Sequence, residues 1–275
     1  MKDLVLFGDC RETLTAFIDK ARMCITSPPY YGQRNYGNEE SQIGLEQSPE
    51  DYVKELVEVF RLVKDNLTDD GTLWVNMGDS YYNYRGGKGQ SLPKQSVSKS
   101  NQDRPQFNPR RGNKLKGYKE KDLIGIPWML AFALRADGWY LRQDIVWSKP
   151  NPMPESVRDR CTKSHEYIFL LSKNQNYYFN VDSIKEPTVS GKGMKRKKSV
   201  WNINTTSYKD AHFAVYPEEL IKPCILAGSQ KGDIILDPFI GSGTTAKVAK
   251  SLGRYYLGCE LHESYGNLIN KRVYG

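Results

Sequence analysis

The sequence predicts an α/β fold, with a mostly parallel β-sheet and helices packed on both of its faces. Short apolar, strand-like runs alternate with segments of helical period along most of the chain, which is the pattern of strands joined by crossover helices. Two of these runs end in Pro- or Gly-rich turns, the kind of sequence that binds ligands at the carboxyl edge of an open sheet. With 275 residues, the chain is expected to form one domain over residues 1–275.

The first long helix is predicted from its capping sequence. Ser48-Pro49-Glu50-Asp51 combines a capping box with proline at the first helical position. The apolar residues that follow recur at helical spacing: Val53, Leu56, Val57, Phe60 and Val63. Residues 69–71 (Asp-Asp-Gly) then break the chain, and residues 72–77 are predicted to form a buried strand.

The remaining elements continue the alternation. We expect a helix over residues 127–136, followed by strands at 140–147 and 167–171. The C-terminal part then contains a helix from Pro217, a strand at 234–236, a helix from Thr244, a strand at 255–257 and a last helix. Strands separated by helices imply a sheet that is mostly parallel and covered on both faces.

Positive charge is concentrated in two segments. Residues 81–120 carry ten Lys and Arg against two acidic residues, and residues 185–209 carry seven against one. The rest of the chain has 23 basic and 29 acidic residues, although the whole chain has a net charge of +8. Basic loops on an acidic body indicate binding to a polyanion such as nucleic acid. Solvated loops without a ligand are the alternative.

Neither basic segment shows an apolar period. Residues 81–120 are rich in Gly, Ser, Asn, Gln, Pro and Lys. This composition cannot bury enough apolar surface to offset the entropy of ordering, so we expect a basic, flexible insertion. Residues 185–209 are similar up to Val200-Trp201-Asn202-Ile203, a short apolar run that we expect to anchor the segment.

The composition also argues against several classes of protein. The five cysteines are scattered without a C-x-x-C pair, and with only three histidines no cluster has metal-ligand spacing. We therefore expect neither a disulfide framework nor a bound metal. No apolar run approaches the roughly 18–20 residues that cross a bilayer, and the start is too short and too acidic for a signal peptide. The expectation is a soluble, cytoplasmic protein without a membrane partner.

A glycine-rich turn follows the strand predicted at residues 234–236. Asp237-Pro238 leads into Gly241-x-Gly243-x-x-Ala246 and a helix, which also matches the dinucleotide-binding fingerprint. A carboxylate before the glycines would repel a pyrophosphate but suits a cationic group, such as the ammonium of S-adenosylmethionine. Glu260, at the end of the next strand, would accept hydrogen bonds from both ribose hydroxyls. The pattern favours S-adenosylmethionine over a nicotinamide cofactor.

A second ligand-binding turn follows the short strand predicted at residues 23–25. Pro28-Pro29 forces the chain out of that strand, which places Ser27, the Pro28 carbonyl and the Tyr30 ring at its carboxyl end. An exocyclic amine is a poor nucleophile because its lone pair is delocalised into the base. A hydroxyl and a carbonyl that accept its two N–H bonds would direct that lone pair toward a sulfonium methyl group. The aromatic ring would stack on a base that has left its helix.

Together, the two turns resemble the motifs of the amino-methylating DNA methyltransferases. Thr26-Ser27-Pro28-Pro29-Tyr30 is similar to the catalytic motif of this family, and residues 237–245 (Asp-Pro-Phe-Ile-Gly-Ser-Gly-Thr-Thr) to its cofactor motif. The catalytic motif comes first, which resembles the beta class. Further similarity covers residues 8–10, 73–80, 122–173 and 212–225. The resemblance implies a Rossmann-like, S-adenosylmethionine-dependent methyltransferase fold with permuted motif order.

The resemblance also assigns roles to residues of both motifs. The catalytic motif would consist of Ser27, Pro28, Pro29 and Tyr30. The cofactor would be bound by residues from three parts of the chain: Asp9, Cys10 and Thr26, then Asp237, Pro238, Phe239, Gly241, Ser242 and Gly243, and finally Glu260.

The residue at position 27 bears on the target base. Ser27 stands where the N6-adenine members of the family commonly have Asp, and Ser-Pro-Pro-Tyr is more typical of N4-cytosine enzymes. The resemblance therefore favours methyl transfer to N4 of a flipped cytosine in DNA. Transfer to N6 of adenine is the alternative, because both reactions use the same amine geometry.

The family normally places its target-recognition region between the two motifs, here over residues 177–211. This region is short, so the insertion at 81–120 would share its work, and the recognised site would be short or read by a homodimer. Poly-basic runs contact phosphates more than bases. We expect contacts to double-stranded DNA from Arg110, Arg111, Lys195, Arg196, Lys197 and Lys198. A restriction endonuclease would be a separate chain.

Two other functions fit part of the sequence. An NAD-dependent oxidoreductase would use the glycine-rich turn and leave Ser27-Pro28-Pro29-Tyr30 without a role. A non-catalytic nucleic-acid-binding protein would use only the two basic segments.

Overall fold

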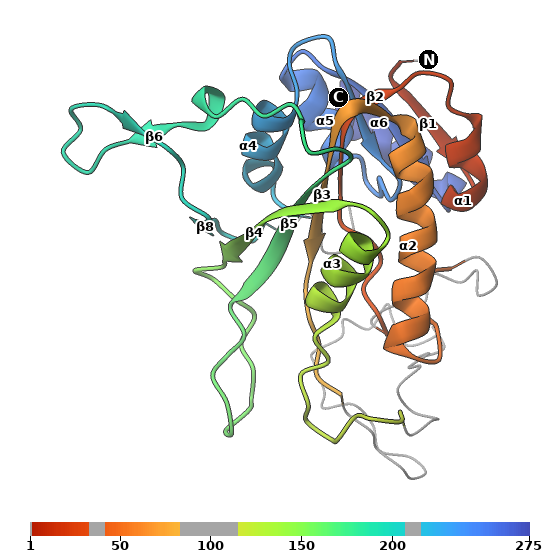
Figure 1. Ribbon diagram of the computed structural model, residues 1–275, viewed down its shortest axis with the longest axis vertical. Coiled ribbons are helices and arrows are strands. Elements are labelled where there is room, and N and C mark those ends of the chain that lie inside the picture. Colours follow the sequence, from red (N-terminus) through yellow and green to blue (C-terminus); the bar gives the residue numbers. More distant parts are fainter. Residues whose placement is uncertain (1, 33–41, 83–114, 207–215) are drawn as a thin grey trace.

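The computed structural model describes residues 2–32, 42–82, 115–206 and 216–275. An eight-stranded sheet runs through it in the order β1-β10-β9-β2-β3-β5-β4-β8 (Figure 1). All neighbouring pairs are parallel except the two that β5 makes with β3 and β4. The strands are β1 (Leu4–Phe7), β2 (Ala21–Thr26), β3 (Leu67–Met77), β4 (Tyr140–Ser148), β5 (His165–Ser172), β8 (Val200–Asn202), β9 (Ile234–Asp237) and β10 (Tyr255–Glu260).

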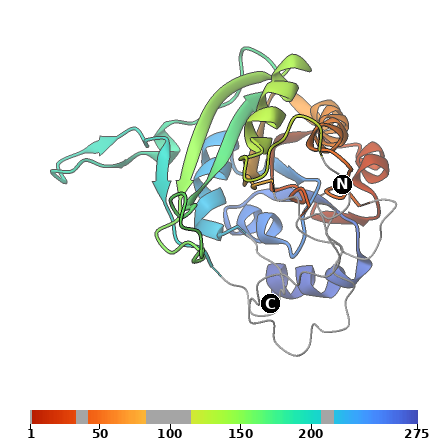
Figure 2. The same ribbon diagram turned by 90° about the horizontal axis from the view of Figure 1, so that it is seen from below.

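Helices cover both faces of the sheet (Figures 1 and 2). One face carries α1 (Cys10–Thr13), α2 (Pro49–Asn66) and α3 (Ile126–Ala136), and the other carries α4 (Glu218–Gly228), α5 (Thr244–Ser251) and α6 (Gly266–Tyr274). Side chains of β2 alternate accordingly, because Cys24 packs in the first core while Met23 and Ile25 pack in the second. The α/β architecture predicted from the sequence is confirmed.

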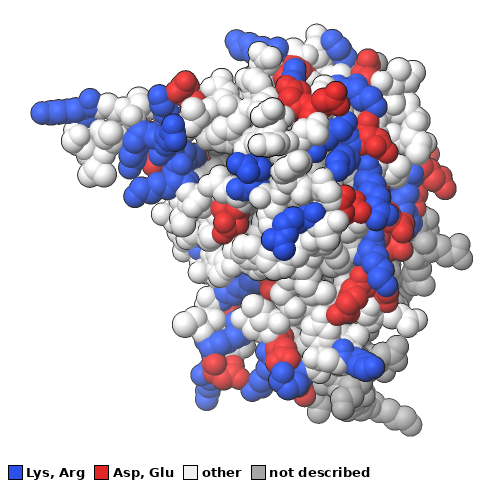
Figure 3. All heavy atoms as spheres, in the orientation of Figure 1, with Lys and Arg blue, Asp and Glu red and all other residues white. Residues whose placement is uncertain are grey.

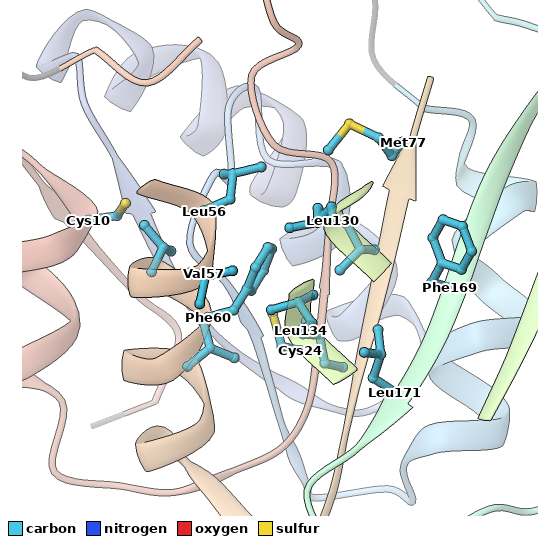
Figure 4. Close-up of a cluster of buried hydrophobic side chains, with 14 of the residues drawn as sticks. Cys10, Cys24, Leu56, Val57, Phe60, Met77, Leu130, Leu134, Phe169 and Leu171 are labelled. Atoms are coloured by element: carbon cyan, nitrogen blue, oxygen red, sulfur yellow. The ribbon is translucent and has the colours of Figure 1, made fainter. Parts of the chain in front are cut away.

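The apolar stripe of α2 fills the first core as predicted. Leu56, Val57 and Phe60 point from the helix toward the strands (Figure 4). The helix begins where the capping sequence predicts, since the Ser48 side chain accepts a hydrogen bond from the Asp51 amide at 3.1 Å. A helix fixed at its start presents the same face to the sheet along its whole length.

The break predicted at residues 69–71 is wrong, because β3 continues through them. Ala21 of β2 pairs with Leu67, whereas Met23 pairs with Thr72, so the extra residues of β3 form an irregularity within the strand. A Cβ atom at Gly71 would lie 2.8 Å from the Thr68 carbonyl oxygen. The Asp-Asp-Gly sequence therefore marks a tight irregularity that requires glycine, and not the end of a strand.

The segment from residue 185 is more structured than its composition predicts. β6 (Glu186–Pro187) and β7 (Met194–Lys195) form a small antiparallel hairpin that projects from the body (Figure 1). We call residues 185–198 the arm. The predicted anchor is confirmed, since β8 joins the main sheet beside β4 and Trp201 is only 5% exposed.

The 81–120 insertion is described only at its two ends. The Tyr82 amide donates to the Asp122 carbonyl at 2.8 Å, and the Leu115 amide donates to the Tyr82 hydroxyl at 3.1 Å. Tyr82 itself is buried. The ends of the insertion are thus tied to the body, while residues 83–114, which include Arg110 and Arg111, lie outside the described residues.

The described part of the chain was compared with the expectations on membrane spans, metal sites and disulfides. None of its helices is both long and apolar enough to cross a membrane. It contains no group of three or more His, Cys, Asp or Glu side chains that could hold a metal ion. All five cysteines are free.

Candidate active site

A cavity of about 310 Å³ lies at the carboxyl edge of the sheet, where β1, β2, β9 and β10 end. Ligands of open α/β sheets bind at this edge. Its walls include most residues predicted for the two motifs: Asp9, Cys10, Ser27, Pro28, Pro29, Tyr30, Pro238, Phe239, Gly241, Ser242 and Glu260. Two turns that lie about 200 residues apart in the sequence thus face one cavity.

The sheet topology brings these turns together. β2 and β9 are parallel neighbours, with Cys24 paired to Leu236. The two strands therefore end within one residue of each other, and the Thr26 hydroxyl donates to an oxygen of Asp237 at 2.6 Å. We call residues 26–30 the catalytic turn and residues 237–245 the cofactor turn, after the motifs that they resemble. This hydrogen bond joins the start of one turn to the start of the other.

Asp237 is a buried carboxylate, 1% exposed, with several internal donors. One oxygen accepts from Thr26 and from the Phe239 amide, at 2.6 and 3.0 Å. The other accepts from the hydroxyls of Thr245 and Tyr216, at 2.5 and 3.1 Å. Burial raises the pKa of Asp237, and these hydrogen bonds, which favour the ionised form, offset part of that rise.

The direct ammonium contact that the sequence suggests for Asp237 stays a prediction. Among the described residues of the cavity wall, Pro238 and Phe239 are present and Asp237 is not. Both oxygens of its carboxylate are engaged inside the protein. These hydrogen bonds hold the shape of the turn.

The two glycines of the turn adopt conformations that other residues rarely adopt. Gly241 has a φ of 52° and Gly243 a φ of 84°. The Gly241 amide donates to Glu260 at 3.0 Å, and Gly243 caps the start of α5. A Cβ atom at Gly243 would also lie 3.2 Å from Cγ2 of Ile269 in α6. The glycines therefore allow both the turn and its close packing.

Glu260 ends β10 and faces the cavity. Its two oxygens accept backbone hydrogen bonds from Gly241 at 3.0 Å and from His262 at 3.1 Å. Burial raises the pKa of Glu260 to about 7, because these bonds compensate only part of the desolvation of its charge. Its remaining lone pairs are acceptors for hydroxyl groups of a ligand.

Asp9 and Cys10 form the wall that follows β1. The Asp9 side chain caps α1 by accepting from the Arg11 amide at 2.8 Å. Burial would raise the pKa of Asp9, but the hydrogen bonds and charge of Arg11 outweigh it and hold the pKa below its usual range. Burial raises the pKa of the Cys10 thiol, which keeps the thiol in its neutral form.

The catalytic turn is held from two sides. The Tyr52 hydroxyl of α2 donates to the Pro29 carbonyl at 2.7 Å. The Tyr30 hydroxyl donates to Glu166 of β5 at 2.7 Å and lies 3.5 Å from the Ser27 hydroxyl. Burial raises the pKa of Tyr30 well above its usual range, and the nearby charge of Glu166 adds to this effect. Tyr30 is therefore a neutral phenol.

Several side chains at the cavity were not predicted as site residues. Asn76, Lys149 and Glu166 line it, and Lys149 forms an ion pair with Glu166. The signal available in the sequence was the placement of charged residues at the ends of apolar strands. Lys149 and Glu166 come together because β4 pairs antiparallel with β5. This pairing places Ser148, the residue before Lys149, opposite His165, the residue before Glu166.

The match to known proteins is extensive. The N6/N4 DNA methylase family model matches residues 21–271. The chain belongs to this family. The Type II methyltransferase M.SmaI of Serratia marcescens is 49% identical over 271 residues, which cover 98% of this chain and 90% of M.SmaI. The Type II methyltransferase M.Cfr9I of Citrobacter freundii is 49% identical over 270 residues, which cover 98% and 86% of the two chains.

Solved structures share the fold of this DNA methyltransferase. The PvuII DNA methyltransferase (cytosine-N4-specific) aligns with a TM-score of 0.71 at 19% identity, covering 100% of this chain and 87% of that one. M1.HpyAVI, solved as its SAM complex, aligns with a TM-score of 0.61 at 18% identity, covering 98% of both chains. The family membership decides against an NAD-dependent oxidoreductase.

The four predicted DNA contacts of the methyltransferase that the structure describes do not belong to the cavity wall. Lys195, Arg196, Lys197 and Lys198 belong to the arm, where Lys and Arg side chains gather (Figure 3). Two of them also face an acid, since the ammonium groups of Lys195 and Lys197 lie 3.5 and 3.8 Å from oxygens of Glu186. These distances describe weak, exchangeable pairs.

The Thr26–Asp237 bond should be important for stability. Thr26→Val removes one donor from a buried carboxylate and is expected to lower the free energy of unfolding by about 1–3 kcal/mol. Urea denaturation of the methyltransferase measures this change. Thr15→Val, which removes an exposed hydroxyl bonded to the Glu12 carbonyl, is the matched control and should change stability by less than about 0.5 kcal/mol. Equal effects of the two substitutions would contradict the role assigned to Thr26.

Proposed function

We propose that this methyltransferase transfers the methyl group of S-adenosylmethionine to N4 of a cytosine flipped out of double-stranded DNA. DNA methyl transfer follows from the family. The choice of cytosine rests on Ser27, which places a hydroxyl, and not a carboxylate, at the head of the catalytic turn. The shared fold of the PvuII enzyme, which is named as cytosine-N4-specific, supports the same choice.

The cavity suits the cofactor in size and chemistry. Its volume of about 310 Å³ is in the range of small-molecule sites. Glu260 offers acceptors for the ribose hydroxyls, and Phe239 offers an apolar wall. When bound, S-adenosylmethionine supplies an electrophilic methyl group on a sulfonium. The residues of the chain have to hold the nucleophile in line with it.

The catalytic turn provides two acceptors for the target amine. The Pro29 carbonyl is engaged by Tyr52. The Pro28 carbonyl, which belongs to a residue of the cavity wall, is the carbonyl that we assign to one N–H of the amine. Ser27 accepts the other. With both N–H bonds held, the nitrogen lone pair turns out of the plane of the base, which restores its nucleophilicity.

The Tyr30 ring is proposed to stack on the flipped base. Its hydroxyl is tied to Glu166, which fixes the orientation of the ring. A Cβ atom at Gly78 would lie 2.9 Å from Cε2 of Tyr30, so glycine lets the ring pack against β3. A ring held in this way offers a stacking surface without a further loss of entropy on binding.

The arm is proposed to contact the DNA backbone. It projects from the body and carries clustered Lys and Arg side chains (Figures 1 and 3). Phosphate contacts of this kind fix the register of a protein on DNA without reading the bases.

M.SmaI and M.Cfr9I are named Type II methyltransferases. A role as the modification enzyme beside a separate endonuclease, and a homodimer, stay predictions.

Nucleoside mass spectrometry tests the reaction. DNA methylated by the wild-type enzyme is expected to contain N4-methylcytosine, whereas N6-methyladenine as the only product would contradict the choice of base. Ser27→Ala removes one acceptor and should lower the rate of transfer by on the order of 10²-fold. Its affinity for the cofactor should stay within about twofold of wild type. Retention of the full rate would contradict the role of Ser27.

Cofactor affinity should depend on pH through Glu260. The free protein holds this carboxyl with a pKa of about 7. Ribose hydroxyls that donate to the ionised form lower that pKa, so binding releases a proton and tightens as the pH rises from 6 to 8. The expected change is at most about tenfold per pH unit.

Calorimetry in buffers of different ionisation enthalpy measures both the affinity and the proton release. Glu260→Gln is the matched control, because an amide does not titrate in this range. It should bind more weakly and show a flat pH profile. A flat profile in the wild type would contradict the role of Glu260.

The arm should contribute to the salt dependence of DNA binding. Replacing Lys195, Arg196, Lys197 and Lys198 by Gln should reduce the slope of log K against log salt by about 0.9 for each phosphate that the arm neutralises. The sequence that is methylated should not change, because phosphate contacts carry no base information. Lys54→Gln on α2, an exposed position outside the arm, is the control. An unchanged slope would exclude the arm from the interface.

A further inference from the structure

A partly buried ion pair lies at the cavity beside the catalytic turn. The Lys149 ammonium contacts one oxygen of Glu166, and the two side chains are only 17% and 15% exposed. The other Glu166 oxygen accepts from the Tyr30 hydroxyl at 2.7 Å and from the Asn76 amide nitrogen at 3.2 Å. Both oxygens of the carboxylate thus have donors.

These contacts impose a direction on the hydrogen bonds of the catalytic turn. An ionised carboxylate can only accept, so the single proton of the Tyr30 hydroxyl points to Glu166. The Tyr30 oxygen then faces Ser27, 3.5 Å away, as an acceptor. The Ser27 proton is directed toward Tyr30, and its lone pairs are left for another donor.

We propose that Glu166 sets the direction of a hydrogen-bond chain from Ser27 through Tyr30, so that Ser27 presents its lone pairs to the target amine. Glu166 is a positioning residue in this proposal, and Lys149 and Asn76 hold its carboxylate. The proposal rests on the function proposed above, in which Ser27 accepts a hydrogen bond from the amine.

The chain of hydrogen bonds is built on rigid elements. Asn76 lies on β3, Glu166 on β5, and Lys149 directly follows β4, so three adjacent strands of the sheet carry the groups around the carboxylate. The second donor bond of Asn76, to the Tyr167 carbonyl at 3.1 Å, fixes the direction of its amide. Side chains on strands keep their geometry better than side chains on loops.

Glycine at position 78 makes the arrangement possible. A Cβ atom there would lie 2.9 Å from Cε2 of Tyr30 and 3.2 Å from Cδ of Glu166. Ring and carboxylate therefore approach each other over a backbone without a side chain. The raised pKa of Tyr30 agrees with this geometry, because a phenol beside a carboxylate keeps its proton.

A double-mutant cycle tests the proposal. Glu166→Gln lets an amide N–H donate to Tyr30, which removes the fixed direction, and Tyr30→Phe removes the link itself. Each substitution is expected to lower the single-turnover rate by about 10- to 100-fold, the range for one hydrogen bond to a charged group. If Glu166 acts through Tyr30, the double variant should be no slower than the slower single variant.

Three controls separate positioning from a structural role. S-adenosylmethionine affinity should stay near wild type in each variant, and rates are compared at a temperature at which thermal unfolding shows every variant to be folded. Glu166→Asp keeps an acceptor-only carboxylate and should retain more activity than Glu166→Gln. Asp137→Asn removes an acid paired with Arg61 between α2 and α3 and should leave the rate unchanged.

Losses in the two single variants that multiply in the double variant would overturn the proposal. Equal rates for Glu166→Asp and Glu166→Gln would also overturn the proposal. This comparison holds even if the glutamine variant is less stable.

The rate is counted as total methylated base. An adenine product would therefore contradict the choice of base and leave this test intact, whereas full activity of Ser27→Ala would remove its premise.

Discussion

The buried carboxylate of Asp237 is the interaction on which the site depends. Its burial is costly unless donors surround it, and the donors come from the end of β2, from the turn after β9, from α5 and from Tyr216 before α4. Because Thr26 immediately precedes Ser27, the same carboxylate holds the catalytic turn and the cofactor turn. Neither turn can shift without leaving a buried oxygen unsatisfied.

The carboxylate of Glu166 holds the other end of the catalytic turn. Glu166 holds the Tyr30 hydroxyl, and Lys149 neutralises its charge. Methyl transfer to an amine needs little covalent help from the protein and depends on alignment of nucleophile and methyl group. Asp237 and Glu166 both lie on strands of the sheet, and each holds one side chain of the catalytic turn by a hydrogen bond.

Much of the fold and of the cavity wall was predictable from the sequence. The capped helix after Ser48 and the glycine-rich turn after Asp237 follow from local rules of capping and backbone conformation. The contacts made by Tyr52, Lys149 and Glu166 were not predictable in this way, because each joins segments far apart in the chain. The break predicted at residues 69–71 was wrong because glycine also permits an irregular strand.

The sequence by itself determined the family, the two turns and most of the residue types that line the cavity, since these depend on short stretches of chain. The tertiary structure decided what those residues do to one another. Asp237 is hydrogen-bonded to Thr26 because β2 lies beside β9. The direction of the Ser27 hydrogen bond depends on Glu166, which only the pairing of β5 with β3 brings near Tyr30.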